Sequence, residues 1–214
     1  MPLLHFMEHF AVSVSAITGV LAARGKSIDL FGVIVLALVA AFGGGTVRDV
    51  ALGDFPVIWI RDPQFFYNAA ITAIVVFYVV RWRDLPQGAL QVADAFGLAL
   101  FTMIGVKKAL AHGAPPGIAA ALGVTTGVVG GILRDLLTDE IPLVFRRETY
   151  LYATAAFGGS VLFLAVDQVF PEQFWSPILG AAAILSLRLA GIRWRIALPV
   201  FRFKSETGKK SSHG

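Results

Sequence analysis

Gly-Gly-Gly-Thr-Val-Arg-Asp at residues 43–49 ends a long apolar run of this chain, and the pattern returns 86 residues later as Val-Gly-Gly-Ile-Leu-Arg-Asp at residues 129–135. Each copy is followed at matching distances by a proline and an aromatic residue: Pro56 and Trp59 in the first, Pro142 and Phe145 in the second. Because the register holds without a gap, the sequence indicates an internal repeat rather than two chance glycine clusters.

The composition is that of a membrane protein. Of 214 residues, 57% are hydrophobic and 15% are charged, whereas a soluble domain carries about 25% charged residues. The chain has no cysteine, which excludes disulfides and thiolate metal sites. The net charge of +4 comes from basic residues between and after the apolar runs, which is typical of membrane orientation signals and not of a nucleic-acid partner.

Seven apolar windows of about 16–25 residues are close to the length that crosses a bilayer. They lie at 4–23, 28–52, 65–80, 89–106, 117–137, 150–166 and 174–191. Most lack the polar stripe that a soluble bundle requires. The sequence therefore predicts an all-α membrane protein with seven transmembrane helices in one domain over residues 1–205, followed by a disordered tail at 206–214.

The repeat also predicts the topology. The offset relates a first unit at 4–82 to a second at 89–168, and the helix at 174–191 stands outside both. Since each unit has three spans, the second enters the membrane from the opposite side, which gives the inverted repeat common in solute-moving proteins. Twelve Lys and Arg residues fall on one side and three on the other, which predicts a cytoplasmic C-terminus and an N-terminus outside.

The repeated glycines favour a water-filled path. Glycine costs about 1 kcal/mol relative to alanine in a helix interior, and a broken span leaves backbone groups that lipid cannot satisfy. We therefore expect breaks in the second and fifth helices at Gly43, Gly44 and Gly45 and at Gly130 and Gly131. Close helix packing is the alternative, since Gly123, Gly127 and Gly131 form a ladder of small residues; both interpretations can hold together.

An arginine and an aspartate follow each glycine cluster: Arg48 and Asp49, then Arg134 and Asp135. Buried arginines are costly in a membrane unless they are paired or hydrated. Glu8 and Asp94 occupy equivalent positions in the two units, so we expect Glu8 to neutralise Arg48 and Asp94 to neutralise Arg134. Pure snorkelling of the arginines is the alternative, and it is the expectation for Arg188 near the end of the last helix.

Other polar residues carry weaker signals. Ser13, Ser15, Thr125 and Thr126 can offer hydroxyls to a cation or to freed backbone, although such residues more often bond between helices. Dinucleotide, P-loop and His-Glu-x-x-His motifs are absent, and no nucleophile or metal set can be assembled from the sequence. We therefore expect no enzymatic activity, no metal and no cofactor.

The doubled Gly-Gly-x-x-Arg-Asp motif, the seven windows and the inverted repeat resemble a prokaryotic member of the trimeric intracellular cation (TRIC) channel family over essentially all of residues 1–205. The resemblance implies a homotrimer in the plasma (inner) membrane, contacting lipid and no nucleic acid, with a pore for K⁺ and Na⁺ in each protomer. By motif match it makes pore-lining candidates of Gly43, Gly44, Gly45, Arg48, Asp49, Gly130, Gly131, Arg134 and Asp135.

Three function classes remain open at this point. The first is a passive cation channel, whose selectivity we expect to come from carbonyl oxygens because the arginines repel cations unless they are screened. The second is a carrier or channel for a small zwitterionic solute such as an amino acid, whose carboxylate suits an arginine. The third is a scaffold or a membrane enzyme. Unitary current steps distinguish a channel from a carrier, which shows saturable uptake of one solute.

Overall fold

The computed structural model describes residues 2–83, 86, 88–146, 151–171 and 173–195, and every regular element among them is helical. In chain order these are α1 (Pro2–Ala22), α2 (Leu30–Leu52), α3 (Ile58–Arg61), α4 (Pro63–Trp82), α5 (Ala89–Ala111), α6 (Pro116–Leu137), η1 (Leu143–Phe145), α7 (Tyr152–Val169) and α8 (Ser176–Trp194). The predicted tail at 206–214 lies outside the described residues.

Capping residues in the short loops set several helix ends. The Asp29 carboxylate accepts a hydrogen bond from the Gly32 amide (2.8 Å) at the start of α2, and Asp62 caps α4 in the same way. Gly53 closes α2 in the left-handed conformation, with φ of 66°. Pro116 occupies the first position of α6, where its missing amide costs nothing.

The long helices have the length and surface of membrane spans. Within the described residues, six are long and apolar enough to cross a bilayer: α2, α4, α5, α6, α7 and α8. The 21-residue α1 corresponds to the first predicted window and packs against α2, α4 and α5. On α4 the large apolar side chains of Ile71 and Val75 are 60% and 55% exposed. An exposed apolar face of this kind is typical of contact with lipid. The predicted all-helical membrane class is confirmed.

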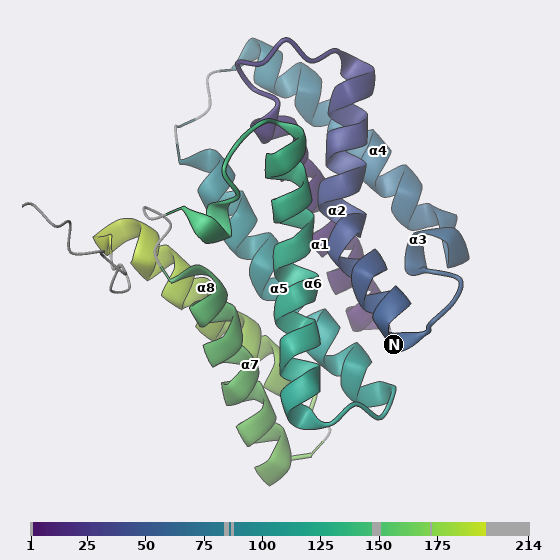
Figure 1. The fold of residues 1–214 in the computed structure, drawn as a ribbon, viewed down its shortest axis with the longest axis vertical. Coiled ribbons are helices and arrows are strands. Elements are labelled where there is room, and N and C mark those ends of the chain that lie inside the picture. The colour runs from purple at the N-terminus through teal and green to yellow at the C-terminus, as the bar shows by residue number, and fades with distance from the viewer. Residues whose placement is uncertain (1, 84–85, 87, 147–150, 172, 196–214) are drawn as a thin grey trace, which may run out of the picture.

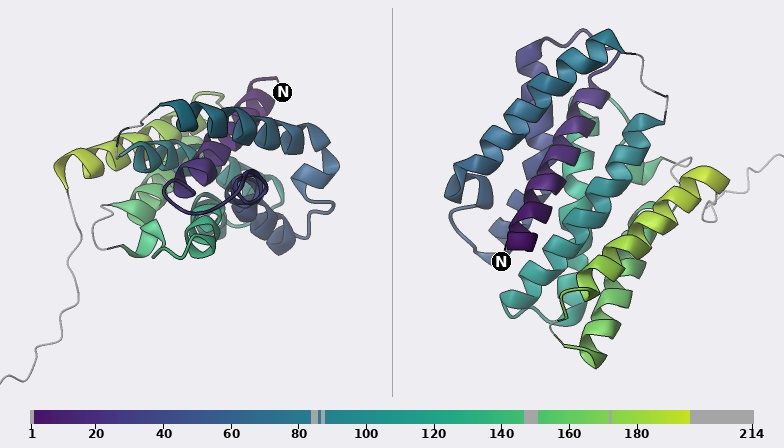
Figure 2. Two further views of the ribbon diagram at one scale, coloured as in Figure 1. Left: turned by 90° about the horizontal axis from the view of Figure 1, so that it is seen from above. Right: turned by 180° about the vertical axis from the view of Figure 1, so that it is seen from behind.

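Four helices form a closed ring at the centre of the molecule. Neighbouring pairs α1–α2, α2–α6, α6–α5 and α5–α1 pack extensively, whereas the diagonal pairs α1–α6 and α2–α5 barely touch. Helix α4 covers the outside of α1 and α2, while α7 and α8 lie against α5 and α6 (Figures 1 and 2). The ring therefore has one covering layer from the first unit and one from the second unit plus α8.

The ring contacts repeat at the 86-residue offset. A Cβ on Gly44 would clash with the backbone of Thr126, and one on Gly130 would clash with the backbone of Ala40, which is the counterpart of Thr126. In Figure 1 the helices of the first unit run opposite to their counterparts in the second. The α2–α6 crossing is thus built from the same contact used twice.

The predicted helix breaks are wrong. Helices α2 and α6 run as continuous α-helices through residues 43–45 and 130–131. The physical reason is close approach: Gly44 and Gly130 let the two helices touch through their backbones, so the alternative of helix packing is the correct interpretation at these positions. Gly44 and Gly130 therefore serve tertiary contact between two intact helices.

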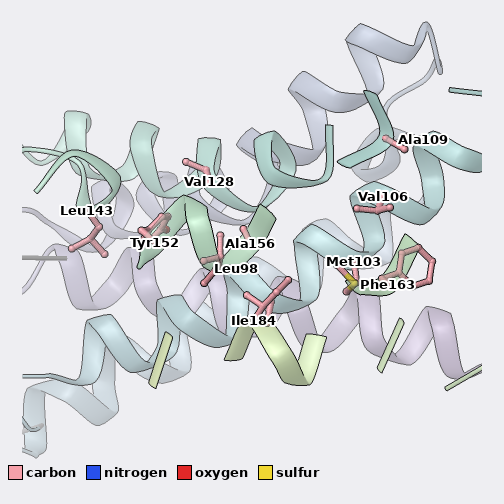
Figure 3. Packing of buried hydrophobic residues seen from close by; sticks show 13 residues of the cluster. Leu98, Met103, Val106, Ala109, Val128, Leu143, Tyr152, Ala156, Phe163 and Ile184 are labelled. Carbon is pink, nitrogen blue, oxygen red and sulfur yellow. The ribbon is translucent and has the colours of Figure 1, made fainter. Parts of the chain in front are cut away.

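Two apolar clusters flank the ring. One joins α1, α2 and α4 through Val33, Phe65 and their neighbours. The other, drawn in Figure 3, joins α5, α6, α7 and α8. In the second cluster Ile184 of α8 is fully buried beside Leu98 and Met103 of α5. The last helix, which has no counterpart in the first unit, is therefore part of the core and not a loose appendage.

Candidate functional site

The Gly-x-x-Arg spacing of the repeated motif places a glycine beneath each guanidinium group. A Cβ on Gly45 would lie 3.7 Å from Arg48 Nη2, and one on Gly131 would lie 3.6 Å from Arg134 Nη2. Long helical side chains point back over the preceding turn, so the residue three positions earlier sits under the arginine. Each guanidinium therefore lies over a glycine of its own helix, at a distance that is ordinary contact for an added Cβ.

The following aspartate holds that guanidinium and the returning chain at once. In both units the arginine Nε donates to Oδ1 of the next residue at 2.8 Å, from Arg48 to Asp49 and from Arg134 to Asp135. The second carboxylate oxygen accepts a backbone amide beyond the helix, from Ile58 (3.2 Å) in one unit and Leu143 (2.8 Å) in the other. The Arg-Asp pair therefore also shapes α3 and η1.

All four of these charged side chains are buried. The exposed fractions of Arg48, Asp49, Arg134 and Asp135 are 1%, 0%, 1% and 2%. The alternative that these two arginines snorkel to solvent is therefore excluded, and their burial demands the pairing that the structure provides.

The two predicted acid partners behave differently. Asp94 bonds Arg134, with Oδ1 3.0 Å from Nη1, as expected from the sequence. Among the described residues Glu8 makes no ion pair with Arg48 within 4.0 Å, although the charges of Arg48 and Lys108 both act on its carboxyl group, so the pairing of Glu8 with Arg48 stays a prediction. Both Nε and Nη2 of Arg48 instead approach Oδ1 of Asp49, at 2.8 and 2.7 Å.

In the first unit a lysine from the second unit supplies the additional charge. Lys108 Nζ lies 2.7 Å from Asp49 Oδ1 and 2.6 Å from Asp54 Oδ2. Arg61 bonds the other oxygen of Asp54 at 2.5 Å. The hydrogen bonds from Lys108 and Arg61 lower the pKa of Asp54 to about 2. Lys108 was not singled out from the sequence, since its contacts with Asp49 and Asp54 are visible only in the structure.

A related contact between units closes the opposite end of the ring. Lys26 donates to the Thr138 carbonyl at the end of α6 and lies 2.9 Å from Glu140. Arg146 also pairs with Glu140, at 3.1 Å. Glu140 is the counterpart of Asp54 at the 86-residue offset, so the sequence relates the two acids, although their lysine partners are not equivalent. Lys26 holds the pKa of Glu140 below its ordinary value.

Lys108→Gln is expected to destabilise the protein by about 1.5–3 kcal/mol, the usual value for a hydrogen bond to a charged group. Lys107→Gln is the matched control, because Lys107 is adjacent to Lys108, carries the same charge and is exposed. Thermal unfolding of both purified variants in one detergent measures the difference. Equal effects would show that the Lys108 contacts contribute nothing.

The same variant has a pH signature. The ion pairs of Asp54 stabilise the folded state above pH 4 and lose that contribution as the pH falls through its folded pKa of about 2. Without Lys108 only Arg61 holds this pKa down, so acid destabilisation of Lys108→Gln is expected to begin at a higher pH than in the parent protein.

Two residues outside the predicted site complete the cluster around Arg134. Arg188 of α8 is fully buried and lies over the ring of Tyr152, 4.5 Å from its centroid, so the prediction that Arg188 snorkels is wrong. A Cβ on Gly131 would lie 3.4 Å from the Tyr152 hydroxyl and 3.3 Å from Asp94 Oδ1. Tyr152, Asp94 and Arg134 thus converge on the space that Gly131 leaves open.

This cluster holds a complementary pair of buried polar atoms. Within the part of the chain that the structure describes, Asp94 Oδ2 and Arg134 Nη2 have no hydrogen-bond partner of good geometry, although the Tyr152 hydroxyl also interacts with the Asp94 carboxylate. An acceptor and a donor of this kind match water or a dipolar group.

The secondary polar candidates are mostly bonded to their own helices. Thr125 and Thr126 donate to the carbonyls of Ala121 and Leu122. Ser13 donates to the His9 carbonyl and to Asn68 of α4, and Ser15 lies against Gly97 where α1 meets α5. Among the described residues, no three His, Asp or Glu side chains form a cluster that could hold a metal.

Comparison with known proteins gives the same repeat. A family model described as "Glycine transporter" matches residues 5–81 and again residues 91–168. The inner membrane protein YadS of Escherichia coli K12, described as UPF0126, is 43% identical over 201 residues, covering 93% of this chain and 96% of the relative. A UPF0126 membrane protein of Vibrio cholerae is 42% identical over 200 residues, covering 93% and 83%.

Solved structures of TRIC channels have a similar fold. A TRIC channel orthologue from Rhodobacter sphaeroides superposes with a TM-score of 0.85 at 37% identity, covering 92% of this chain and all of that one (100%). A second TRIC cation channel gives a TM-score of 0.83 at 27% identity, covering 94% and 98%. These neighbours are channels and not enzymes. The chain therefore belongs to the UPF0126 membrane proteins of the family described as glycine transporters, and it is a prokaryotic relative of the TRIC channels.

Proposed function

We propose that this protein is a channel for monovalent cations such as K⁺ and Na⁺, with one path inside the ring of α1, α2, α5 and α6 in each protomer. The observation that carries the proposal is the burial of paired charges from both units at the two ends of this ring. Buried charges at membrane depth are expensive, and they typically mark ion pathways. The likeness to TRIC cation channels supports the same function.

The proposed lining consists of the charged side chains and the glycines beneath them. It includes Arg48, Asp49, Arg134, Asp135, Glu8, Asp94, Gly45 and Gly131. We assign Gly43, Gly44 and Gly130 to packing, because a Cβ on each would come closer than 3.0 Å to an atom of the neighbouring helix. Thr125 and Thr126 are left out because their hydroxyls bond their own helix.

The pairing answers the difficulty that arginines repel cations. Arg134 lies between two carboxylates, and Arg48 shares Asp49 with Lys108. A guanidinium paired at about 3 Å presents little net charge to a passing ion, whereas an unpaired one would dominate a path of low dielectric constant. We therefore expect cation conduction to stop when these pairs separate, because an unpaired guanidinium repels the cation.

A small zwitterion is the second candidate. The family description names glycine, and the buried atoms Asp94 Oδ2 and Arg134 Nη2 match an ammonium and a carboxylate group respectively. Such a solute would cross by saturable uptake if the protein is a carrier.

The test is a comparison of fluxes in one preparation. The fluxes of K⁺, Na⁺, Cl⁻ and glycine are measured in liposomes that contain the purified protein. Single-channel current is recorded in planar bilayers. We expect K⁺ and Na⁺ flux with unitary steps, and Cl⁻ flux at the level of empty liposomes. Saturable glycine uptake without unitary steps would contradict the channel and establish the second candidate.

We further propose a homotrimer in the inner membrane, with the N-terminus outside and the C-terminus in the cytoplasm. The relatives named TRIC and inner membrane protein support the assembly and the location. The basic residues Arg24, Lys26, Arg81 and Arg146 lie toward one end of the bundle, which supports that orientation.

A further inference from the structure

A pocket with a basic rim opens between the ends of three helices. It has a volume of about 250 Å³ and lies where α1 and α4 end and α2 begins. Its walls are the side chains of Phe77 and five aliphatic residues. Arg24, Lys26 and Arg81 complete the lining. The pocket is thus apolar within and carries three positive charges, which is an amphipathic pattern.

The surroundings of the pocket are those of a membrane interface. Helix α4, which forms one wall, is the least buried of the candidate spans, with 17% of its apolar window buried. Trp82, next to Arg81, is 83% exposed, and exposed tryptophans at helix ends are typical of the headgroup level. This end of the bundle also carries Arg146, so its field favours anions.

We propose that this pocket binds an anionic phospholipid, with the phosphate at Arg24, Lys26 and Arg81 and part of one acyl chain against Phe77 and the aliphatic wall. Basic pockets between transmembrane helices bind anionic headgroups in this manner. A free phosphate would leave the apolar wall exposed, and a zwitterionic lipid would bring no net negative charge to the basic rim. The volume holds a portion of a lipid and not the whole molecule.

Lys26 connects this pocket to the ring. The same ammonium group donates to the Thr138 carbonyl and pairs with Glu140 of the second unit. Thr138 in turn donates to the carbonyls of Arg134 and Asp135. A lipid phosphate therefore competes with Glu140 for Lys26, and removal of the Glu140 charge is expected to tighten lipid binding.

The experiment titrates the purified full chain in detergent with phosphatidylglycerol or with phosphatidylcholine of the same acyl chains. Native mass spectrometry counts retained lipid, and thermal unfolding measures stabilisation. We expect phosphatidylglycerol to bind and stabilise, and Arg81→Gln to weaken its binding about fivefold, the effect of removing one basic group near an anionic headgroup. Lys107→Gln, at the other end of the bundle, is expected to have no effect.

Glu140→Gln is expected to bind phosphatidylglycerol more tightly than the parent, whereas Asp139→Asn, with the same change in net charge, is not. Equal binding of the two lipids, or unchanged binding in Arg81→Gln, would overturn the proposal and indicate a pocket filled by a neighbouring protomer or by unspecific lipid. Stabilisation by inorganic phosphate alone would indicate a site for free anions and would equally overturn it. None of these readouts depends on which solute the protein conducts.

Discussion

Arg134→Ala is expected to destabilise the folded protein by about 3–5 kcal/mol, because it leaves buried carboxylates without their counter-charge. Arg134 lies 3.0 Å from Asp94 and 2.8 Å from Asp135, and none of the three is more than 5% exposed. No lysine approaches either carboxylate within ion-pair distance among the described residues. The variant is expected to yield little monodisperse protein and to unfold at a clearly lower temperature.

Arg48→Ala is the matched comparison, since it removes the equivalent residue of the first unit. Its cost is expected to be smaller, about 1.5–3 kcal/mol, because Asp49 keeps Lys108 at 2.7 Å and the Ile58 amide at 3.2 Å. Fluorescence-detected size exclusion and thermal unfolding in one detergent rank the two. An equal loss would mean that Lys108 does not compensate Asp49. The double variant Arg134→Ala with Asp94→Asn should recover part of the loss, because one buried charge is removed.

Gly44→Ala is the second variant with a large expected effect. The added Cβ would meet the backbone carbonyl of Thr126 well inside 3.0 Å, and backbone in a packed helix cannot move aside as a flexible side chain does. Overpacking costs about 1–3 kcal/mol and sometimes more, and here it would push α2 away from α6. We expect the upper part of that range, or a failure to fold.

Gly45→Ala, one residue along, is the control for the glycine cluster. Its Cβ would lie 3.7 Å from Arg48 Nη2, which is ordinary contact, and alanine in a helix interior gains about 1 kcal/mol over glycine. We expect Gly45→Ala to be neutral or stabilising. If helix breaks were the purpose of this cluster, both substitutions would impair flux while stabilising the helix, so unfolding and flux together decide between packing and breaks.

The repeat, the apolar helices and the charged residues of the repeated motif could be predicted from the sequence. Apolar runs of bilayer length predict spans whatever their neighbours are, and the 86-residue offset relates equivalent positions without a structure. Asp94 was paired with Arg134 in this way, and the pairing is confirmed. The surroundings of Arg48 could not be predicted from the offset, because Lys108, which pairs with Asp49, has Ala22 as its counterpart and the symmetry is broken there.

By itself the sequence determined that this is an all-helical membrane protein made of two related units, because hydrophobic length and repetition are properties of the chain alone. Only the tertiary structure decided what the glycines and the buried charges do. Gly44 and Gly130 allow a close helix crossing, and Arg188 is buried over Tyr152. The reason is that the cost of a glycine or a buried charge depends on the atoms beside it, and those atoms come from helices far away in the chain.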